Sequence, residues 1–204
     1  DAEERTPYLS ALGSPADVAA LLADLLPELP PRQRLTVPRG TTALVPAWVG
    51  VEGATDWDFR WRSAPPPAQP GEERVVEVDD ERAVAALLSA ASPRASALPG
   101  DAAVRRWWGV PGDGGELLAC IGDTSAATGV GHLSSVAVAG SARRRGLGSA
   151  VTAAATRALL ARGCDVVTLG LYADNAVGRA LYDRLGFADD HRFTSGRLLQ
   201  RSRW

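Results

Sequence analysis

The sequence contains no lysine: all 22 of its basic residues are arginines. Without lysine no Schiff base can form, which excludes pyridoxal-phosphate enzymes and lysine-dependent aldolases. The lysines that P-loop ATPases and protein kinases require are missing for the same reason. Methionine is also absent, which predicts that Asp1 is not the native start of the protein.

Cysteine and histidine are scarce, with two residues of each. Cys120 and Cys164 stand far apart and form no C-x-x-C pair, and His132 and His191 are the only histidines. A Cys/His zinc cluster is therefore not expected, and we predict no metal. Two isolated cysteines are typical of reduced, semi-buried thiols in a cytoplasmic protein.

The formal net charge is −2, which gives no reason to expect broad electrostatic binding of nucleic acid. No apolar run reaches the roughly 18 residues that a membrane span requires. The sequence also lacks a basic segment followed by an apolar stretch, which is the pattern of a secretory signal. The 204 residues are 46% hydrophobic, enough for a real core in one large or two small domains. We expect a cytoplasmic protein that binds neither nucleic acid nor membranes.

A proline-rich stretch divides the chain. Residues 63–73 read SAPPPAQPGEE, which resists helix and sheet and predicts a stiff linker. Residues 1–62 are expected to form an N-terminal extension or a degenerate half-domain, and residues 74–204 the main domain.

Before the linker, the spacing of apolar residues predicts a helix over residues 15–26 with Ser14 as its N-cap. Strands are expected over residues 41–51 and 56–62. The second strand alternates an aromatic with a charged face: Trp57, Phe59 and Trp61 against Asp58, Arg60 and Arg62. We expect the aromatic face to be buried against the main domain, although it could instead form the surface of a homodimer.

After the linker, strands and helices alternate. Short apolar runs predict strands over residues 75–78, 105–110, 117–121, 131–138, 166–171 and 191–199. Helical spacing predicts helices over residues 80–91, 147–162 and 175–185. This order predicts an α/β fold of the mixed-sheet (α+β) kind. The aromatic segment 105–110 could line a ligand pocket or belong to the core.

A glycine-rich loop with three arginines lies between the strand 131–138 and the helix 147–162. It reads Arg143, Arg144, Arg145, Gly146, Leu147, Gly148 and Ser149. Backbone N–H groups and the positive end of the helix dipole meet there, which suits an anion such as pyrophosphate. The arginines add charge and can bind phosphate oxygens in a forked geometry. The alternative is a simple turn with solvated arginines.

A second candidate lies in the helix 175–185. Asn175 and Tyr182 are seven positions apart and share a helix face. Tyr182 stands beside the predicted core stripe of Val177, Leu181 and Leu185, so it should face sideways toward a cleft. A phenol, with an unperturbed pKa of about 10, could donate a proton there. The alternative is an N-cap asparagine and a half-buried packing tyrosine.

Taken together, the two motifs resemble those of the GNAT superfamily of acyl-CoA-dependent N-acyltransferases, over about residues 75–198. The R/Q-x-x-G-x-G/A motif is matched by Arg143, Gly146 and Gly148. The N-x-x-A-x-x-L-Y-x-x-x-G-F helix is matched by Asn175, Leu181, Tyr182, Gly186 and Phe187, with Gly178 where the family has alanine.

The resemblance implies the GNAT fold, a mixed sheet splayed at its centre, here with an N-terminal extension. It implies acetyl-CoA as cosubstrate and no metal. The strand residues Val136, Ala137 and Val138 would bond the pantetheine arm, and the loop from Arg143 to Ser149 would hold the pyrophosphate. Asn175 would contact the pantetheine or a bridging water, and Tyr182 would protonate the departing thiolate.

A base must also take a proton from the attacking amine. His132 stands four residues before the first valine of V-A-V, where superfamily members often have glutamate. It shares strand parity with Ser134, Val136 and Val138, so it should face their side. A neutral imidazole, with an unperturbed pKa of about 6.5, could serve as the base. The alternative is a histidine satisfied by hydrogen bonds at the strand start.

Glu116 and Asp123 are weaker candidates for the base. A further alternative is that a backbone carbonyl or water accepts the proton with no dedicated base. Tyr172 is a candidate for shaping the acceptor pocket. The resemblance implies direct acetyl transfer from acetyl-CoA to a primary amine. Because the near-neutral charge shows no feature for an extended charged partner, we expect a small-molecule acceptor. The alternative is a non-catalytic acyl-CoA-binding regulatory module, which the histidine at position 132 keeps open and Tyr182 counts against.

Overall fold

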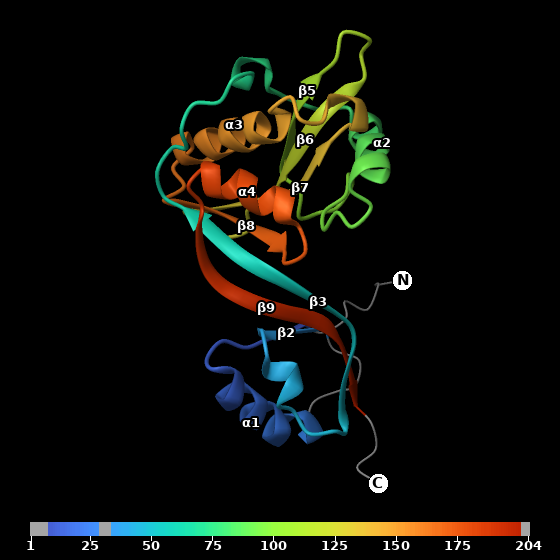
Figure 1. Ribbon diagram of the computed structural model, residues 1–204, viewed down its shortest axis with the longest axis vertical. Coiled ribbons are helices and arrows are strands. Elements are labelled where there is room, and N and C mark those ends of the chain that lie inside the picture. The colour runs from blue at the N-terminus through green and yellow to red at the C-terminus, as the bar shows by residue number, and fades with distance from the viewer. Residues whose placement is uncertain (1–7, 29–33, 201–204) are drawn as a thin grey trace. The chain divides into compact units, whose positions relative to one another are not determined.

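The computed structural model describes residues 8–28 and 34–200 (Figure 1). The chain forms two compact units, each built from separate stretches of sequence. Unit 1 comprises the described residues up to Phe59, Leu171–Asn175, and the described residues from Asp190 onward. Unit 2 comprises Arg60–Gly170 and Ala176–Asp189, and so includes the proline-rich segment 63–73.

Unit 1 is a small sheet with one helix. Its strands are β1 (Tyr8–Ser10), β2 (Arg34–Pro38), β9 (Ala188–Gln200) and β3 (Val49–Arg62), in that order across the sheet. β1 and β2 are parallel, and β2 and β9 are antiparallel. The long strands β3 and β9 each continue into unit 2.

Helix α1 (Pro15–Leu25) follows the prediction: the hydroxyl of Ser14 caps it by accepting from the Asp17 N–H at 3.2 Å. Its buried face joins the core of unit 1. The strand expected over residues 41–51 is wrong in its first half. Thr41–Ala43 form a short 3₁₀ turn after Gly40, whose φ is +99°. Pro46 then lies before β3, where its missing N–H is no loss to the sheet.

Unit 2 is built on five strands, β4 (Val76–Glu77), β5 (Arg106–Pro111), β6 (Leu117–Asp123), β7 (Val130–Val138) and β8 (Val166–Tyr172). β4 to β7 are antiparallel neighbours, and β7 and β8 are parallel. Helix α2 (Glu81–Ala91) covers one face of this sheet and α3 (Leu147–Ala161) the other, with α4 (Ala176–Arg184) beside α3 (Figure 1). The predicted mixed α/β fold is confirmed.

The core of unit 2 contains the two tryptophans of the segment 105–110. Trp107 and Trp108 are only 3% and 4% exposed, and Trp107 packs with α2 through Val84, Leu87 and Leu88. These tryptophans therefore belong to the core rather than to a pocket wall.

Helix α3, which the sequence predicts over residues 147–162, is buried almost all round, and Ala154 and Ala158 are half-buried. The proline-rich segment adds a contact on a further side of α3. Arg157 donates to Glu72 at 2.9 Å and to the Pro66 carbonyl.

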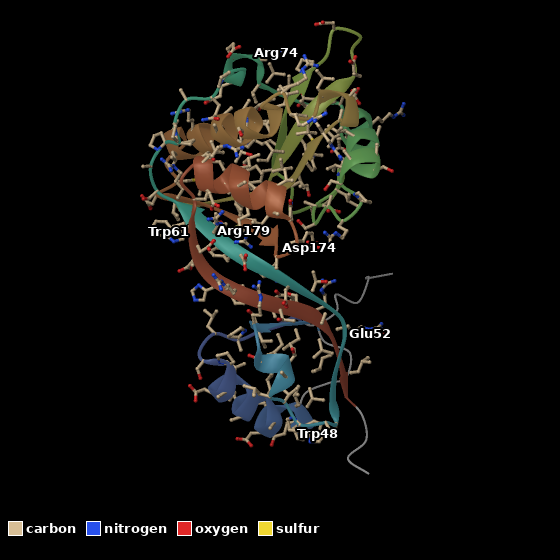
Figure 2. The ribbon with its side chains drawn as sticks, in the orientation of Figure 1. Trp48, Glu52, Trp61, Arg74, Asp174 and Arg179 are labelled. Carbon is tan, nitrogen blue, oxygen red and sulfur yellow. The ribbon has the colours of Figure 1, made fainter. Side chains whose placement is uncertain are left out.

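The charged face of the strand 56–62 is more buried than predicted and the aromatic face is less buried, with Trp57 and Phe59 half-buried. Asp58 and Arg60 are buried, at 1% and 4% exposure, whereas Trp61 is 38% exposed (Figure 2). In unit 1, Arg39 donates to the Asp58 carboxylate at 2.7 Å. Because paired charges can be buried when their hydrogen bonds are satisfied, polarity alone did not identify the outer face.

In the part of the chain that the structure describes, no helix combines the length and the apolar character needed to cross a membrane.

Candidate active site

β7 and β8 separate partway along their length. Their described register runs from Val130 opposite Val166 to Leu133 opposite Leu169 and ends there. β7 continues to Val138, still paired with β6 on its other side. A strand edge without a neighbouring strand offers backbone N–H and C=O groups to an extended ligand. Val136, Ala137 and Val138 lie on this separated part of β7.

A β-bulge marks the point of separation. Gly122 of β6 lies opposite Ser134, whereas Cys120 lies opposite Ala137, so β7 has one extra residue between the two pairs. Ser135 has a φ of +56°, a left-handed value that is uncommon for serine. Its hydroxyl accepts from the Ala97 N–H at 2.9 Å and donates to the Ala97 carbonyl at 2.8 Å. These two bonds fix the bulge in place.

The bulge reverses the side-chain parity of β7. Gly131 faces α3, because a β-carbon there would lie 2.9 Å from the Leu159 side chain, so His132 faces away from α3. Val138 faces α3, since it lies 3.5 Å from the β-carbon that Gly148 would carry. The prediction that His132 and Val138 face the same side is therefore wrong, because simple alternation does not account for an inserted residue.

His132 is held by two hydrogen bonds. Its backbone N–H donates to the Ser125 hydroxyl at 2.9 Å, and its ring Nδ1 lies 2.8 Å from the Thr168 hydroxyl on β8. Burial holds the pKa of His132 below its ordinary value, against the opposing effect of the Asp123 carboxylate. The imidazole is therefore neutral near neutral pH.

The loop before α3 carries the three arginines on an exposed, left-handed turn. Arg143, Arg144 and Arg145 are all exposed, and Arg144 and Gly146 have φ values of +61° and +79°. Gly146 has no side chain to cap the helix, and a β-carbon there would meet no atom within 4 Å. The free backbone N–H groups of the first turn of α3, which start at Leu147, therefore lie next to the open space at Gly146.

Gly148 has a packing role. A β-carbon at this position would lie 3.0 Å from Leu181 of α4 and 3.5 Å from Val138 of β7. Its carbonyl accepts from the Thr152 hydroxyl at 2.8 Å, and Ser149 beside it is buried. Glycine therefore allows the start of α3 to approach both α4 and the separated part of β7.

Tyr182 faces the interior of unit 2 rather than sideways. It is 7% exposed and meets Phe187 edge-on, with 5.8 Å between ring centroids. Burial raises its pKa to about 12, although the nearby Arg60 guanidinium acts to lower it. The predicted core stripe is wrong at Val177, which is 82% exposed in the first turn of α4, whereas Leu185 is fully buried.

Arg60 holds α4 in place and was missed by the sequence reasoning. Its guanidinium pairs with Asp183 of α4 and with Asp189, each at 2.6 Å, and reaches the Arg179 carbonyl at 3.5 Å. The sequence signal for Arg60 was a charged residue within a strand of alternating polarity. Its partners are too distant in sequence for residue spacing to reveal them.

Three further residues were predicted to belong to the site. Glu116 ends the hairpin between β5 and β6, with its carboxylate over Gly112 and Gly114. Tyr172 and Asn175 belong to unit 1, where the Asn175 N–H donates to the Tyr172 carbonyl at 3.0 Å. Their predicted roles stay predictions.

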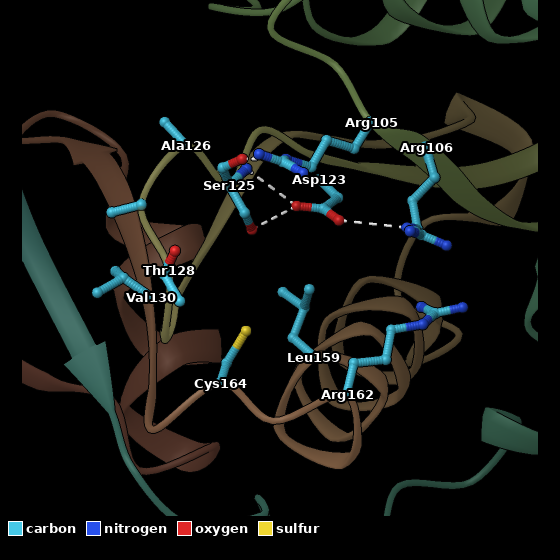
Figure 3. Close-up of a pocket in the computed structure, with 11 residues that line it drawn as sticks. Arg105, Arg106, Asp123, Ser125, Ala126, Thr128, Val130, Leu159, Arg162 and Cys164 are labelled. Atoms are coloured by element: carbon cyan, nitrogen blue, oxygen red, sulfur yellow. Dashed lines mark hydrogen bonds and ion pairs between the residues drawn. The ribbon is translucent and has the colours of Figure 1, made fainter.

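A separate pocket of about 220 Å³ lies in unit 2 near the C-terminal end of α3 (Figure 3). Its charged groups already have partners: Arg106 reaches Asp123 at 3.3 Å, and Arg105 donates to the Ser125 carbonyl. Arg162 pairs with Glu77, outside the pocket lining. The Cys164 thiol also lines it, and burial raises the pKa of that thiol. Within the described residues, no group of three or more His, Cys, Asp or Glu side chains could hold a metal ion.

One family model matches the part of the chain that carries this site. Residues 100–187, which include β7, the arginine loop, α3 and α4, match the model described as the acetyltransferase (GNAT) family. A comparison with curated proteins finds no match.

Solved structures show the same fold. A GNAT-family protein from Novosphingobium aromaticivorans is 25% identical, with a TM-score of 0.68 over 97% of this chain and 85% of that one. A GCN5-related N-acetyltransferase from Sphaerobacter thermophilus is 21% identical, with a TM-score of 0.62 over 88% of this chain and 64% of that one. A tandem GNAT protein from the clavulanic acid biosynthesis pathway is 16% identical, with a TM-score of 0.58 over 97% and 77%. The last two likenesses concern the fold alone.

Proposed function

Because the chain carries a GNAT acetyltransferase domain over residues 100–187, we propose that it transfers the acetyl group of acetyl-CoA to the primary amine of a small molecule. The observation that carries this proposal is the start of α3. There the exposed arginines 143–145 adjoin a helix N-terminus that Gly146 leaves uncapped by any side chain.

This helix start fits the pyrophosphate of acetyl-CoA. Anions bind well at helix N-termini, where free N–H groups and the helix dipole act together. Arginine adds forked hydrogen bonds to phosphate oxygens. The sequence from Ala139 to Ala161 contains no acidic residue that would repel the ligand. The separated part of β7 supports pantetheine binding, because an extended amide chain can pair with a strand edge.

The protein's own residues are assigned two tasks, accepting the amine proton and stabilising the charge on the departing sulfur. As the amine attacks the thioester carbonyl, a C–N bond forms and a C–S bond breaks. The neutral imidazole of His132 takes the amine proton. Tyr182, whose pKa burial raises to about 12, stays protonated at neutral pH and donates a hydrogen bond to the sulfur as negative charge develops.

The acceptor is proposed to be small because the net charge of −2 suggests no adaptation to an extended charged partner. A cytoplasmic location is proposed with it, supported by the free thiols of Cys120 and Cys164. The second candidate function is a non-catalytic acyl-CoA-binding module. The observation that favours it is histidine at position 132, where the family often has glutamate.

The test is release of free CoA thiol from acetyl-CoA during incubation with a panel of small primary amines. Thiol release that depends on one of the amines, with the matching acetylated product, supports acetyl transfer. Binding of acetyl-CoA with no amine-dependent release would favour the regulatory module. Tyr182→Phe is the matched control, since it should bind acetyl-CoA and release thiol slowly.

A further inference from the structure

His132 and Thr168 form a hydrogen-bonded pair across the parallel strands β7 and β8. They lie directly opposite each other, one pair before the register of the two strands ends at Leu133 and Leu169. Their side chains meet with 2.8 Å between His132 Nδ1 and Thr168 Oγ1. Thr168 is 5% exposed, so water has little access to this contact.

The direction of this hydrogen bond follows from proton counting. The Thr168 hydroxyl has one proton, which it donates to the Gly131 carbonyl at 2.9 Å. Its oxygen can therefore only accept from the imidazole, so Nδ1 of His132 must carry a hydrogen. In a neutral imidazole, a hydrogen on Nδ1 leaves the lone pair on Nε2.

From this geometry we infer that Thr168 is a positioning residue that selects the tautomer of His132, with the hydrogen on Nδ1 and the basic lone pair on Nε2. The catalytic meaning of this selection rests on the proposed function, because it matters only where His132 accepts a proton from an amine. The opposite tautomer would present an N–H group at Nε2 and could not act as the base there.

The surroundings of His132 keep this arrangement intact. The Ser125 hydroxyl accepts the backbone N–H of His132, and it donates to the Asp123 carboxylate at 2.5 Å. The charge of Asp123 on β6 acts on the imidazole and favours its protonated form. Burial opposes it and prevails, so the neutral, tautomer-selected form is the one present near neutral pH.

The tautomer can be measured without any activity assay. The chain has two histidines, so a long-range ¹H–¹⁵N spectrum of the imidazole rings shows two sets of signals. His191→Asn identifies the set of His132. The inference predicts the Nδ1–H tautomer in the wild type. It also predicts a shift of about tenfold toward Nε2–H in Thr168→Val, as expected for the loss of one net hydrogen bond.

Two variants keep this measurement interpretable. Thr168→Ser retains the hydroxyl and should restore the Nδ1–H tautomer. Thr156→Val removes another buried threonine hydroxyl, one that donates within α3, and should leave the His132 signals unchanged. An Nε2–H tautomer in the wild type, or an unchanged tautomer in a folded Thr168→Val protein, would overturn the inference.

Kinetics then test whether the tautomer matters for the reaction. Thr168→Val should lower kcat about tenfold and leave the KM for acetyl-CoA unchanged. The acid limb of kcat/KM should move to lower pH, because the imidazolium loses a charge-assisted hydrogen bond. In a His132→Gln background the same substitution should have no further effect, since Thr168 acts through His132.

The outcomes separate the two claims. If Thr168→Val lowers kcat as much in the His132→Gln variant as it does in the wild type, the positioning role of Thr168 is wrong. The Nδ1–H tautomer in a protein that acetylates no amine would uphold the tautomer assignment and count against the proposed function alone.

Discussion

Replacing Tyr182 by phenylalanine removes one hydroxyl from the interior of unit 2. The ring is 7% exposed and packs edge-on against Phe187 at 5.8 Å, and phenylalanine keeps that contact. The neighbouring Arg60 remains paired with Asp183 and Asp189. Because the packing contact is kept, we expect the free energy of unfolding to change by no more than about 1 kcal/mol, the size of a small polar effect.

The effect on catalysis should be much larger. Burial raises the pKa of Tyr182 to about 12, whereas a thiol has an unperturbed pKa of about 8.5. Complete proton transfer from this phenol to the thiolate is thus uphill by about 5 kcal/mol, at 1.36 kcal/mol per pKa unit. The phenol acts as a hydrogen-bond donor to the developing charge, and loss of such a donor or acid costs about 10²–10⁴-fold in rate.

The assay is release of CoA thiol under saturating acetyl-CoA and acceptor, with acetyl-CoA affinity measured separately by calorimetry. The account predicts that Tyr182→Phe lowers kcat by about 10²–10⁴-fold and leaves the Kd for acetyl-CoA unchanged. Unchanged turnover in the variant would remove Tyr182 from the mechanism. A weakened Kd with unchanged kcat would assign it to binding only.

Three further predictions follow from the site and from unit 1. Gly146→Val places a β-branched residue at a φ of +79° and fills the open position before α3, so calorimetry should show sharply weaker acetyl-CoA binding; undiminished affinity would make the loop a simple turn. Arg39→Met breaks the 2.7 Å ion pair with the buried Asp58, so urea denaturation should show the free energy of unfolding to fall by about 3 kcal/mol. An unchanged denaturation midpoint would refute the role of this pair. Because burial holds the pKa of His132 below its ordinary value of 6.5, kcat/KM should be level through neutral pH and fall only below 6.5 as the base becomes protonated; a fall that begins above 6.5 would contradict this role.

Local patterns made much of the fold predictable. The N-cap Ser14, the apolar face of α2 and the arginine loop before α3 each depend on residues close together in sequence. Gly146 could be placed in a turn because glycine readily adopts a positive φ, here +79°, of the kind that such turns require. The mixed α/β class followed from the order of such elements.

Contacts between distant residues account for what was missed. The bulge at Ser135 depends on its two hydrogen bonds to Ala97, and it changed which face His132 occupies. The burial of Arg60 depends on Asp183 and Asp189. Neither feature has a periodic signal in the sequence, because an inserted residue and a buried ion pair both break the alternation from which strand faces are predicted.

Calorimetric titration of the protein with acetyl-CoA, followed by the same titration with CoA, tests whether an acetyl-CoA site lies at the start of α3. We expect saturable binding of both ligands at micromolar concentrations, with Gly146→Val as the weakened control. Absence of heat and of saturation with either ligand, in a protein shown to be folded, would contradict the acetyl-CoA site at the start of α3 and the acetyl-transfer function proposed from it.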